Sequence, residues 1–289
     1  MEINNKNSLS WDQIILHIQN NAAYKDLVKS CYYDDPIENA AQRFYESKEW
    51  LNISELFKKK GKIIDIGAGR GISLYAFAKT GWSTYAIDPN DGNVSGLKAI
   101  QKLFLSFNLR AELKKTTSEN IMFDSNYFDL VYTRQSLHHC NNLALTCDEI
   151  NRVLKPGGFF FATREHVVNN RKELDIFLEK HPLHKYTKQE NAFTLKEYTS
   201  AIKNSGLKIL KIFKTYDTEI NYDPKSLDEI INHYMKNWPF VENVYKKINR
   251  SQFLPLKIIV KKLLIKFLNY KNDKIPGRPY SFLAVKKFK

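Results

Sequence analysis

An acid and three closely spaced glycines carry the clearest chemical signal in this chain. Lys62–Ile66 is a short apolar run, and Gly67, Gly69 and Gly71 follow it directly. Glycines at the turn between a buried strand and a helix let a ligand approach the backbone closely. The spacing G-x-G-x-G, with the carboxylate of Asp65 two residues before the first glycine, disfavours a pyrophosphate and favours a ligand with an ammonium group.

A second acid lies at the end of the next apolar run. Trp82–Ile87 is predicted to be a strand, and Asp88 follows it. An acid at the end of the second strand is suited to bind both hydroxyls of a ribose. A ligand with a ribose and a cationic, amino-acid-like end is S-adenosyl-L-methionine, whose product after methyl transfer is S-adenosyl-L-homocysteine.

At these residues the sequence resembles the class I S-adenosylmethionine-dependent methyltransferases. D-I-G-A-G-R-G is similar to their first motif, Y-A-I-D-P to their second and L-K-P-G-G-F to a later one, so the resemblance extends to about Val168. It implies an α/β fold, a Rossmann-like seven-stranded methyltransferase sheet with helices on both faces. It also implies an N-terminal helical cap and a helical insertion before the last strand.

The resemblance also implies which residues contact the cofactor. Many family members hold the adenine amino group with an Asp after the third strand, and the matching position here is Thr117. A hydroxyl can replace that carboxylate, and two polar residues follow it. The cofactor contacts implied by the motifs are Asp65, Gly67, Ala68, Gly69, Asp88, Pro89, Thr117, Ser118 and Glu119.

Ionisable residues follow the predicted strand Phe128–Tyr132, in T-R-Q-S-L-H-H-C. Ligands of open α/β sheets lie beyond the carboxyl ends of the strands, so Arg134, Gln135, His138 and His139 are expected near the transferred methyl group. We assign Arg134 and Gln135 to the cofactor and prefer His139 to His138 as a base. No third ligand at metal spacing accompanies the histidine pair, so no metal site is predicted.

Three ionisable residues, Arg164, Glu165 and His166, follow the predicted strand Phe159–Thr163. Such groups at the sheet edge are costly unless they are paired or used. One interpretation is an ion pair and a surface histidine. The other makes His166 a general base oriented by Glu165, with Arg164 near an anionic group. A histidine base suits a hydroxyl acceptor, which predicts O-methylation with His166 or His139 as the base.

Further residues are candidate contacts to the acceptor substrate. The loop after the helix Asn169–Lys180 contains H-P-L-H-K-Y and then E-N-A-F, in a region where this fold commonly carries acceptor specificity. For each residue alone, helix packing or a solvated loop is the simpler alternative. The substrate contacts predicted in this way are Tyr33, Arg43, Arg164, His181, His184 and Tyr186, and Glu190 lies in the same loop.

The chain is expected to divide into four parts. Residues 1–60 form an N-terminal helical cap, residues 61–213 the cofactor-binding core, residues 214–278 a helical insertion or lid, and residues 279–289 the last core strand. K-P-G-G is expected to be a turn between the helix Asn142–Leu154 and the fifth strand. The other strands are expected at Ala111–Lys115, Leu207–Phe213 and Tyr280–Lys286.

Composition narrows the location and the partners. Three cysteines without a C-x-x-C pair fit a reducing cytoplasm, and neither a signal peptide nor an apolar run of membrane-spanning length is visible. The net charge is +14, and thirteen Lys or Arg against two acids lie between Val241 and Lys289. Residues 256–268 carry an apolar helix face opposite lysines, which predicts packing on the domain or, alternatively, peripheral contact at the inner face of the membrane.

Three functions remain open from these residues. The pattern most resembles bacterial methyltransferases of surface-polysaccharide gene clusters, which implies polysaccharide biosynthesis and a small-molecule or carbohydrate-type acceptor. The basic C-terminal region makes an RNA methyltransferase an alternative, although no RNA-binding module or aromatic-basic stacking motif is present. The third alternative is a non-catalytic cofactor-binding or scaffold protein. The oligomeric state is not predicted.

Overall fold

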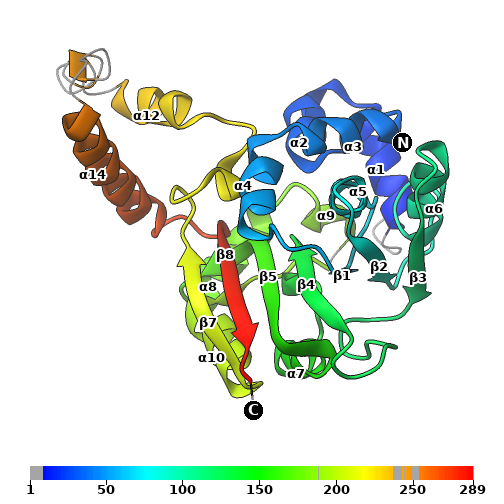
Figure 1. Ribbon diagram of the computed structural model, residues 1–289. Helices are drawn as coiled ribbons and strands as arrows, with labels where there is room; N and C mark the ends of the chain where they lie inside the picture. Colours follow the sequence, from blue (N-terminus) through cyan, green and yellow to red (C-terminus); the bar gives the residue numbers. More distant parts are fainter. Residues whose placement is uncertain are drawn as a thin grey trace.

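The computed structural model describes residues 9–187, 189–236 and 254–288, together with Asn243, Tyr245, Lys247 and Ile248. Within this part of the chain an eight-stranded sheet has the order β3-β2-β1-β4-β5-β8-β7, with the short β6 paired to β5 (Figure 1). The strands are β1 (Lys62–Ile66), β2 (Ser83–Asp88), β3 (Ala111–Lys115), β4 (Phe128–Arg134), β5 (Leu154–Val168), β6 (Phe193–Thr194), β7 (Leu207–Phe213) and β8 (Arg278–Lys286).

Only β8 runs against its neighbours among the described strands. It pairs antiparallel with β5 and β7, whereas β3, β2, β1, β4 and β5 form parallel pairs. Parallel strands end at the same edge, so the glycine turn after β1, Asp88 at the end of β2 and the histidines after β4 converge there. This mostly parallel Rossmann-like sheet confirms the fold class predicted from the sequence.

Both faces of the sheet are covered by helices. Successive residues of a strand point to opposite faces, and Ile63 and Ile64 of β1 therefore enter two different apolar clusters. One cluster contains residues of α5 (Ile72–Lys79) and α6 (Leu97–Ser106), and the other contains residues of α7 (Leu143–Val153) and α10 (Leu195–Asn204). Burial on both faces explains why β1 is apolar except for Lys62 at its start and Asp65.

The N-terminal residues form a group of short helices at one end of the sheet (Figure 1). They are α1 (Trp11–Gln19), η1 (Ala22–Tyr24), α2 (Lys25–Cys31), α3 (Ile37–Tyr45) and α4 (Lys48–Leu56). Phe44 and Trp50 lie on two successive helices, α3 and α4. Ser47 separates them because its side chain caps α4 by accepting a hydrogen bond from the Trp50 backbone N–H.

The fifth strand differs most from the sequence-based expectation. β5 begins at Leu154, so K-P-G-G lies inside the strand instead of forming a separate turn. The strand also continues through Arg164, Glu165 and His166, which were predicted to follow it. Its pairing with β8 changes register between Ala162 and Glu165, where Arg164 has a φ of 58°. This irregularity lets the strand continue past the point where the apolar run stops.

The segment between β7 and β8 contains helices joined by turns in the part that the structure describes. It contains α11 (Glu219–Tyr222), α12 (Leu227–Met235) and α14 (Leu254–Asn272), and α14 extends away from the sheet (Figure 1). Between β5 and β7 lie α8 (Arg171–Lys180) and α9 (His184–Thr187). No described helix combines the length and the apolar character needed to cross a membrane.

Helix α14 packs on α12 through residues near its C-terminal end. Leu268 is buried against α12, with Leu264 and Ile265 partly buried beside it. The predicted apolar face remains exposed at Ile259 and Leu263, which are 55% and 62% accessible. This face was predicted to contain Leu256, Ile259, Val260, Leu263, Leu264 and Phe267. The expectation that this face packs on the domain is therefore wrong for the N-terminal half of the helix.

Candidate active site

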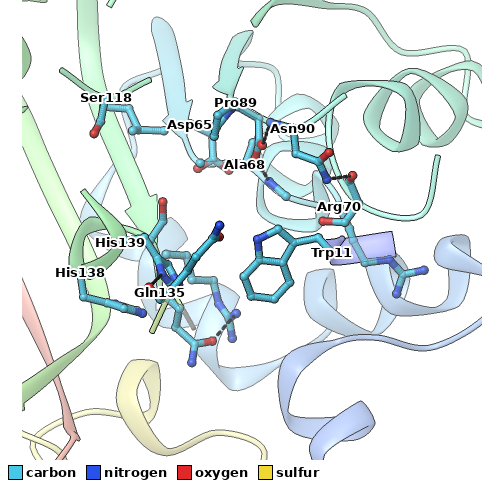
Figure 2. Close-up of a pocket in the computed structure, with 18 of the residues that line it drawn as sticks. Trp11, Asp65, Ala68, Arg70, Pro89, Asn90, Ser118, Gln135, His138 and His139 are labelled. Atoms are coloured by element: carbon cyan, nitrogen blue, oxygen red, sulfur yellow. Dashed lines mark hydrogen bonds between the residues drawn. The ribbon is translucent and has the colours of Figure 1, made fainter. Parts of the chain in front are cut away.

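A pocket of about 640 Å³ lies at the carboxyl edge of the parallel strands. Its walls come from the glycine turn, the ends of β2 and β4, the N-terminal cap and the loop after α9. Figure 2 shows Ala68, Pro89 and Asn90 on one side and Gln135, His138 and His139 on the other, with the Trp11 indole between them. This volume fits a nucleoside-sized ligand together with a small second substrate.

The glycine turn is a close backbone cradle. Gly67 and Gly69 have φ values of 66° and 54°, in the left-handed region that side chains rarely adopt. A Cβ on Gly67 would lie 1.8 Å from the Ser136 hydroxyl, so the loop after β4 also requires glycine there. Gly71 precedes α5, whose first backbone N–H groups are directed toward the turn.

Asp65 lies under this cradle and is almost completely buried. Its Oδ2 accepts a hydrogen bond from the Ser73 hydroxyl at 2.6 Å. Burial raises the pKa of Asp65 to about 7, although the Ser73 hydrogen bond acts in the opposite direction. A buried carboxyl with this pKa gains a cationic partner readily, which is the chemistry expected for an amino-acid ammonium group.

Asp88 holds the turn together and also lines the pocket. Its Oδ2 accepts from the Gly69 backbone N–H and its Oδ1 from the Asn90 backbone N–H, both at 2.8 Å. Burial raises the pKa of Asp88, and these two hydrogen bonds partly oppose the shift. The carboxylate therefore fixes the turn, and its remaining lone pairs are those available to ribose hydroxyls.

The predicted adenine-binding residues line the same pocket, but some of their side chains already make hydrogen bonds within the protein. Thr117, Ser118 and Glu119 all lie on its wall. The Ser118 hydroxyl is 3.0 Å from the Thr146 hydroxyl. Glu119 Oε1 accepts from the backbone N–H groups of Asn141 and Asn142, at 2.6 and 3.1 Å. The Thr117 side chain is likewise engaged, because its hydrogen bond to Glu119 helps to lower the pKa of that carboxyl.

Arg134 and Gln135 also line the pocket, and an ion pair with Glu49 fixes the Arg134 guanidinium. Glu49 of α4 accepts from Arg134 Nε and Nη2, and its Oε2 also accepts from Arg164 Nη1 at 2.8 Å. Arg134 Nη1 donates to Gln135 Oε1 at 2.9 Å. Although burial alone would raise the pKa of Glu49, the two guanidinium groups hold it below its usual value.

Glu165 contacts a different histidine from the one predicted. Its Oε2 is 2.7 Å from His138 Nδ1 and also accepts from the His138 backbone N–H at 3.1 Å. Its Oε1 accepts from the backbone N–H groups of Ser136 and Leu137, each at 3.2 Å. The proposed orientation of His166 by Glu165 is therefore not present; Glu165 fixes η2 (Leu137–His139) and the His138 ring.

His166 lines the pocket with its Nδ1 engaged by a backbone carbonyl. The partner is Gly277 O at 2.9 Å, so Nδ1 donates and Nε2 is the atom able to accept a proton. Burial lowers the pKa of His166 to about 3 and likewise lowers the pKa of His139. Both imidazoles are consequently neutral near pH 7, as a base must be before it removes a proton.

The loop after α9 brings Glu190 to the histidine pair. Glu190 Oε2 lies 3.8 Å from both His138 Nε2 and His139 Nε2, and Glu190 Oε1 lies 3.9 Å from His181 Nδ1. Burial raises the pKa of Glu190 to about 7 and lowers that of His181 to about 3. The sequence showed no third ligand for the pair because Glu190 follows it by about fifty residues.

The predicted substrate contacts divide into two groups. Tyr33 and His181 line the pocket, whereas Arg43, Arg164, His184 and Tyr186 are not among its lining residues. Arg164 is buried against Glu49 and the Asp223 carbonyl oxygen, so its assignment to an anionic substrate is wrong. Arg43 pairs with Asp34, and the Tyr186 hydroxyl contacts His17 and Tyr24. These groups stabilise the cap.

Residues of the cap that sequence reasoning missed also reach the pocket. The Trp11 ring lies edge-on to His139, with 6.1 Å between ring centroids. Asp12 Oδ1 accepts from the Ser95 backbone N–H at 2.9 Å, which ties α1 to the loop after β2. Arg70 Nη1 donates to the Tyr32 carbonyl at 3.0 Å and so joins the glycine turn to the cap. The arginine in G-A-G-R-G was the available signal.

Comparison with known proteins finds a family match for the core of the chain. Residues 64–162 match the family described as "Methyltransferase domain". The chain is 33% identical over 97 residues to the ubiquinone/menaquinone biosynthesis C-methyltransferase UbiE of Cupriavidus taiwanensis, covering 34% of this chain and 40% of that protein. UbiE of Burkholderia mallei gives 33% identity over 98 residues, with the same coverage. The chain thus spans about two fifths of these curated relatives.

Solved structures share the fold over most of the chain. A putative sarcosine dimethylglycine methyltransferase from Galdieria sulphuraria has a TM-score of 0.56 at 20% identity, covering 96% of this chain and 98% of that chain. Phosphoethanolamine N-methyltransferase 2 of Haemonchus contortus, in complex with S-adenosyl-L-methionine, has a TM-score of 0.54 at 16% identity, covering 93% and 61%. At these identities the structural likeness shows the shared fold, and the match to the methyltransferase domain family is confined to residues 64–162.

Proposed function

We propose that this protein transfers a methyl group from S-adenosylmethionine to a hydroxyl of a small or carbohydrate-type acceptor. The observation that carries the proposal is a shared pocket: Asp65, Asp88 and the glycine turn form one wall, and His139 and His166 lie on the same cavity. An adenosyl amino acid on the first wall directs its methyl group toward the imidazoles. The enzyme then needs mainly to align the acceptor oxygen for in-line attack.

A neutral imidazole favours oxygen as the acceptor atom, because a hydroxyl must lose its proton during transfer. Two histidines are placed to take it. His139 is partly open to the pocket, and its Nδ1 lies 3.1 Å from the Gln189 carbonyl, so its Nε2 is the free position. His166 is deeper and has the same tautomer, fixed by Gly277 O. Polysaccharide precursors are the acceptor class that the resemblance to methyltransferases of surface-polysaccharide gene clusters implies. The motifs that carry this resemblance are D-D-P-I-E-N-A-A-Q-R-F-Y-E-S-K-E-W, R-E-H, H-P-L-H and G-R-P-Y-S-F.

The matched relatives leave the acceptor open. UbiE is named as a C-methyltransferase, but its match covers about one third of this chain. The acceptor wall here comes from the cap and from the loop after α9. An RNA acceptor is the second candidate, because lysines and arginines gather in the C-terminal region, and RNA binding of that kind would weaken steeply with salt.

Calorimetry and a methyl-release assay test the proposal together. Wild-type protein is titrated with S-adenosylhomocysteine, and Asp65→Asn and Asp88→Ala are compared with the surface variant Asp26→Ala. We expect wild-type and control to bind alike and each pocket variant to bind at least tenfold more weakly. Methyl release is then measured across sugars, sugar nucleotides and RNA. Binding without any turnover favours the scaffold alternative, and no binding by the wild type overturns the function.

A further inference from the structure

Three ligand groups from two distant parts of the chain face one another in the pocket. His138 and His139 lie on η2, after β4, and Glu190 lies in the loop after α9. Their nearest ligand atoms, the two Nε2 atoms and a carboxylate oxygen, lie within 4.8 Å of one another. Figure 2 shows both histidines beside Gln135, on the pocket wall opposite Ala68 and Pro89.

Hydrogen bonds on the far side of each ring direct a lone pair toward Glu190. The His138 Nδ1 lies 2.7 Å from Glu165 Oε2, and Glu165 also accepts three backbone N–H groups and therefore acts as an acceptor. The His139 Nδ1 lies 3.1 Å from the Gln189 carbonyl, which can only accept. Both Nδ1 atoms donate, so both Nε2 atoms carry lone pairs. A histidine held by a carboxylate in this way is typical of metal ligands.

The third group has no hydrogen-bond donor among the described residues. The Glu190 side chain is 3% exposed, and its closest polar contacts are the imidazole nitrogens at 3.8 to 3.9 Å. A buried carboxylate facing two lone pairs leaves all three groups without a positive partner, which is costly in a low-dielectric site. A cation placed between them would satisfy all three.

We propose that His138, His139 and Glu190 bind one divalent transition-metal ion, of the Zn²⁺, Mn²⁺ or Fe²⁺ type. Two imidazoles and one carboxylate suit these ions. Metal–ligand bonds of about 2.0–2.1 Å put tetrahedral ligand atoms about 3.3 Å apart. The two glutamate–histidine separations are 3.8 Å and all three ligand atoms lie within 4.8 Å of one another, so side-chain rotation must bring them closer to bind an ion. His181 Nδ1 lies 3.9 Å from the other carboxylate oxygen, Glu190 Oε1. Further coordination positions open into the pocket, where a substrate oxygen can bind.

The catalytic role of the metal ion rests on the proposed function, whereas metal binding itself does not. An acceptor hydroxyl bound to the ion becomes more acidic, as metal-bound water does. The acceptor O–CH₃ bond then forms while the S–CH₃ bond of the cofactor breaks, and the hydroxyl proton passes to His166 Nε2. His139 is assigned to the ion in this arrangement, and His166 is the base.

Metal uptake by tag-free, chelator-stripped protein tests the site directly. Zn²⁺ and Mn²⁺ are titrated calorimetrically, and the bound metal is counted after desalting by inductively coupled plasma mass spectrometry. We expect one equivalent per chain for the wild type. Glu190→Gln and His139→Asn should each weaken uptake at least a hundredfold. His233→Asn, which changes a histidine on α12 away from the pocket, is the matched control and should bind as the wild type does.

Other measurements separate this inference from the proposed function. Glu190→Gln should still bind S-adenosylhomocysteine, which shows that the variant is folded. His166→Ala should keep the metal and lose methyl transfer, whereas His139→Asn should lose both. S-adenosylhomocysteine binding without stoichiometric metal uptake, or unchanged metal affinity in both cluster variants, overturns the metal site alone. Metal uptake by a wild type that binds no S-adenosylhomocysteine overturns the proposed function and leaves the metal site standing.

Discussion

The Glu49 carboxylate of α4 accepts two hydrogen bonds from the Arg134 guanidinium at the end of β4, from Nε at 2.7 Å and from Nη2 at 3.0 Å. The same carboxylate accepts from Arg164 of β5. One buried acid thus joins the N-terminal cap to two central strands and balances two buried cations. Because Arg134 also lines the pocket, this ion pair positions one pocket wall as well as stabilising the fold.

Glu49→Gln should therefore destabilise the protein strongly. The change leaves two buried guanidinium groups without a charge partner, and breaking a buried pair in this way costs about 3–5 kcal/mol. Chemical denaturation followed by circular dichroism measures the loss. Asp34→Asn is the control, because its ion pair with Arg43 is partly exposed and should contribute about 0–1 kcal/mol. Equal losses of unfolding free energy in the two variants would show that the buried Glu49 ion pairs stabilise the protein no more than an exposed pair does.

Asp12→Ala should loosen the cap over the cofactor. Asp12 accepts from the backbone N–H groups of Ser95 and Asn93, at 2.9 and 2.8 Å, and so holds Trp11 over the pocket. Removing these charge-assisted hydrogen bonds should speed S-adenosylhomocysteine dissociation about tenfold, equivalent to about 1.4 kcal/mol. Stopped-flow tryptophan fluorescence measures this rate. Asp26→Ala on the exposed side of α2 should leave it unchanged, and an unchanged rate in both variants would mean that α1 is not a lid.

Cofactor binding should strengthen as pH rises from about 6 to 8. The pKa of Asp65 is about 7 in the unliganded protein, raised by burial, and only the ionised carboxylate pairs with the cofactor ammonium group. Calorimetry in buffers of different ionisation enthalpy should detect the released proton. Asp88 and Arg134 act on Asp65 in opposite directions, and Glu190, with a similar pKa, also titrates nearby. The titration is therefore made in a Glu190→Gln background.

Two variants test whether Asp65 causes the pH dependence of cofactor binding. Ser73→Ala removes the hydroxyl that favours the ionised carboxylate, so the midpoint should move to higher pH. Asp65→Asn should bind weakly at every pH. Stability has a related sign: the folded pKa of Asp65 exceeds its ordinary value of 3.8, so the folded state retains this proton longer. Asp65 therefore lowers the free energy of unfolding as pH rises from about 4 to 7. A flat binding profile would exclude Asp65 as the ammonium partner.

Local patterns were sufficient for most of the fold. An apolar run bounded by turn residues identified β1 with its observed limits, because a parallel strand buried on both faces is largely apolar. β7 was also placed at its observed limits, although it is a partly exposed edge strand that runs antiparallel to β8. The glycines and Asp88 fall on one pocket because strand order places the ends of β1 and β2 side by side. β5 was too short in the prediction, because its continuation pairs with β8, more than a hundred residues away.

The chemistry of the site depended more on tertiary contacts. Glu165 and His166 are adjacent, which suggested a pair, but the loop after β4 supplies the groups that Glu165 binds. Glu190 approaches His138 and His139 only through the fold. The roles of Arg164 and Arg43 were misread for the same reason, since their acidic partners on other elements carry no sequence signature. The sequence shows which charged side chains need a partner if they are buried. The partner itself is known only from the fold.

Helix α14 should bind anionic membranes through its exposed apolar face. Ile259 and Leu263 lie on that face, whereas Lys261, Lys262 and Lys266 are exposed around the same helix. Apolar side chains that enter the headgroup region, next to lysines that attract anionic lipid, are typical of interfacial helices. Co-sedimentation with vesicles containing phosphatidylglycerol should retain the wild type, whereas vesicles of phosphatidylcholine alone should retain much less.

Two variants test the membrane prediction by replacing an exposed leucine with glutamate, one on α14 and one on α6. Leu263→Glu should reduce co-sedimentation at least tenfold, because a carboxylate on the apolar face opposes both burial and the anionic surface. Leu105→Glu on α6 is the control, since Leu105 is 79% accessible but lies outside α14, and it should bind vesicles as the wild type does. Equal binding by all three proteins would reject α14 as the contact. A Leu263→Glu change that instead converts a dimer to a monomer would assign this face to a second copy of the chain.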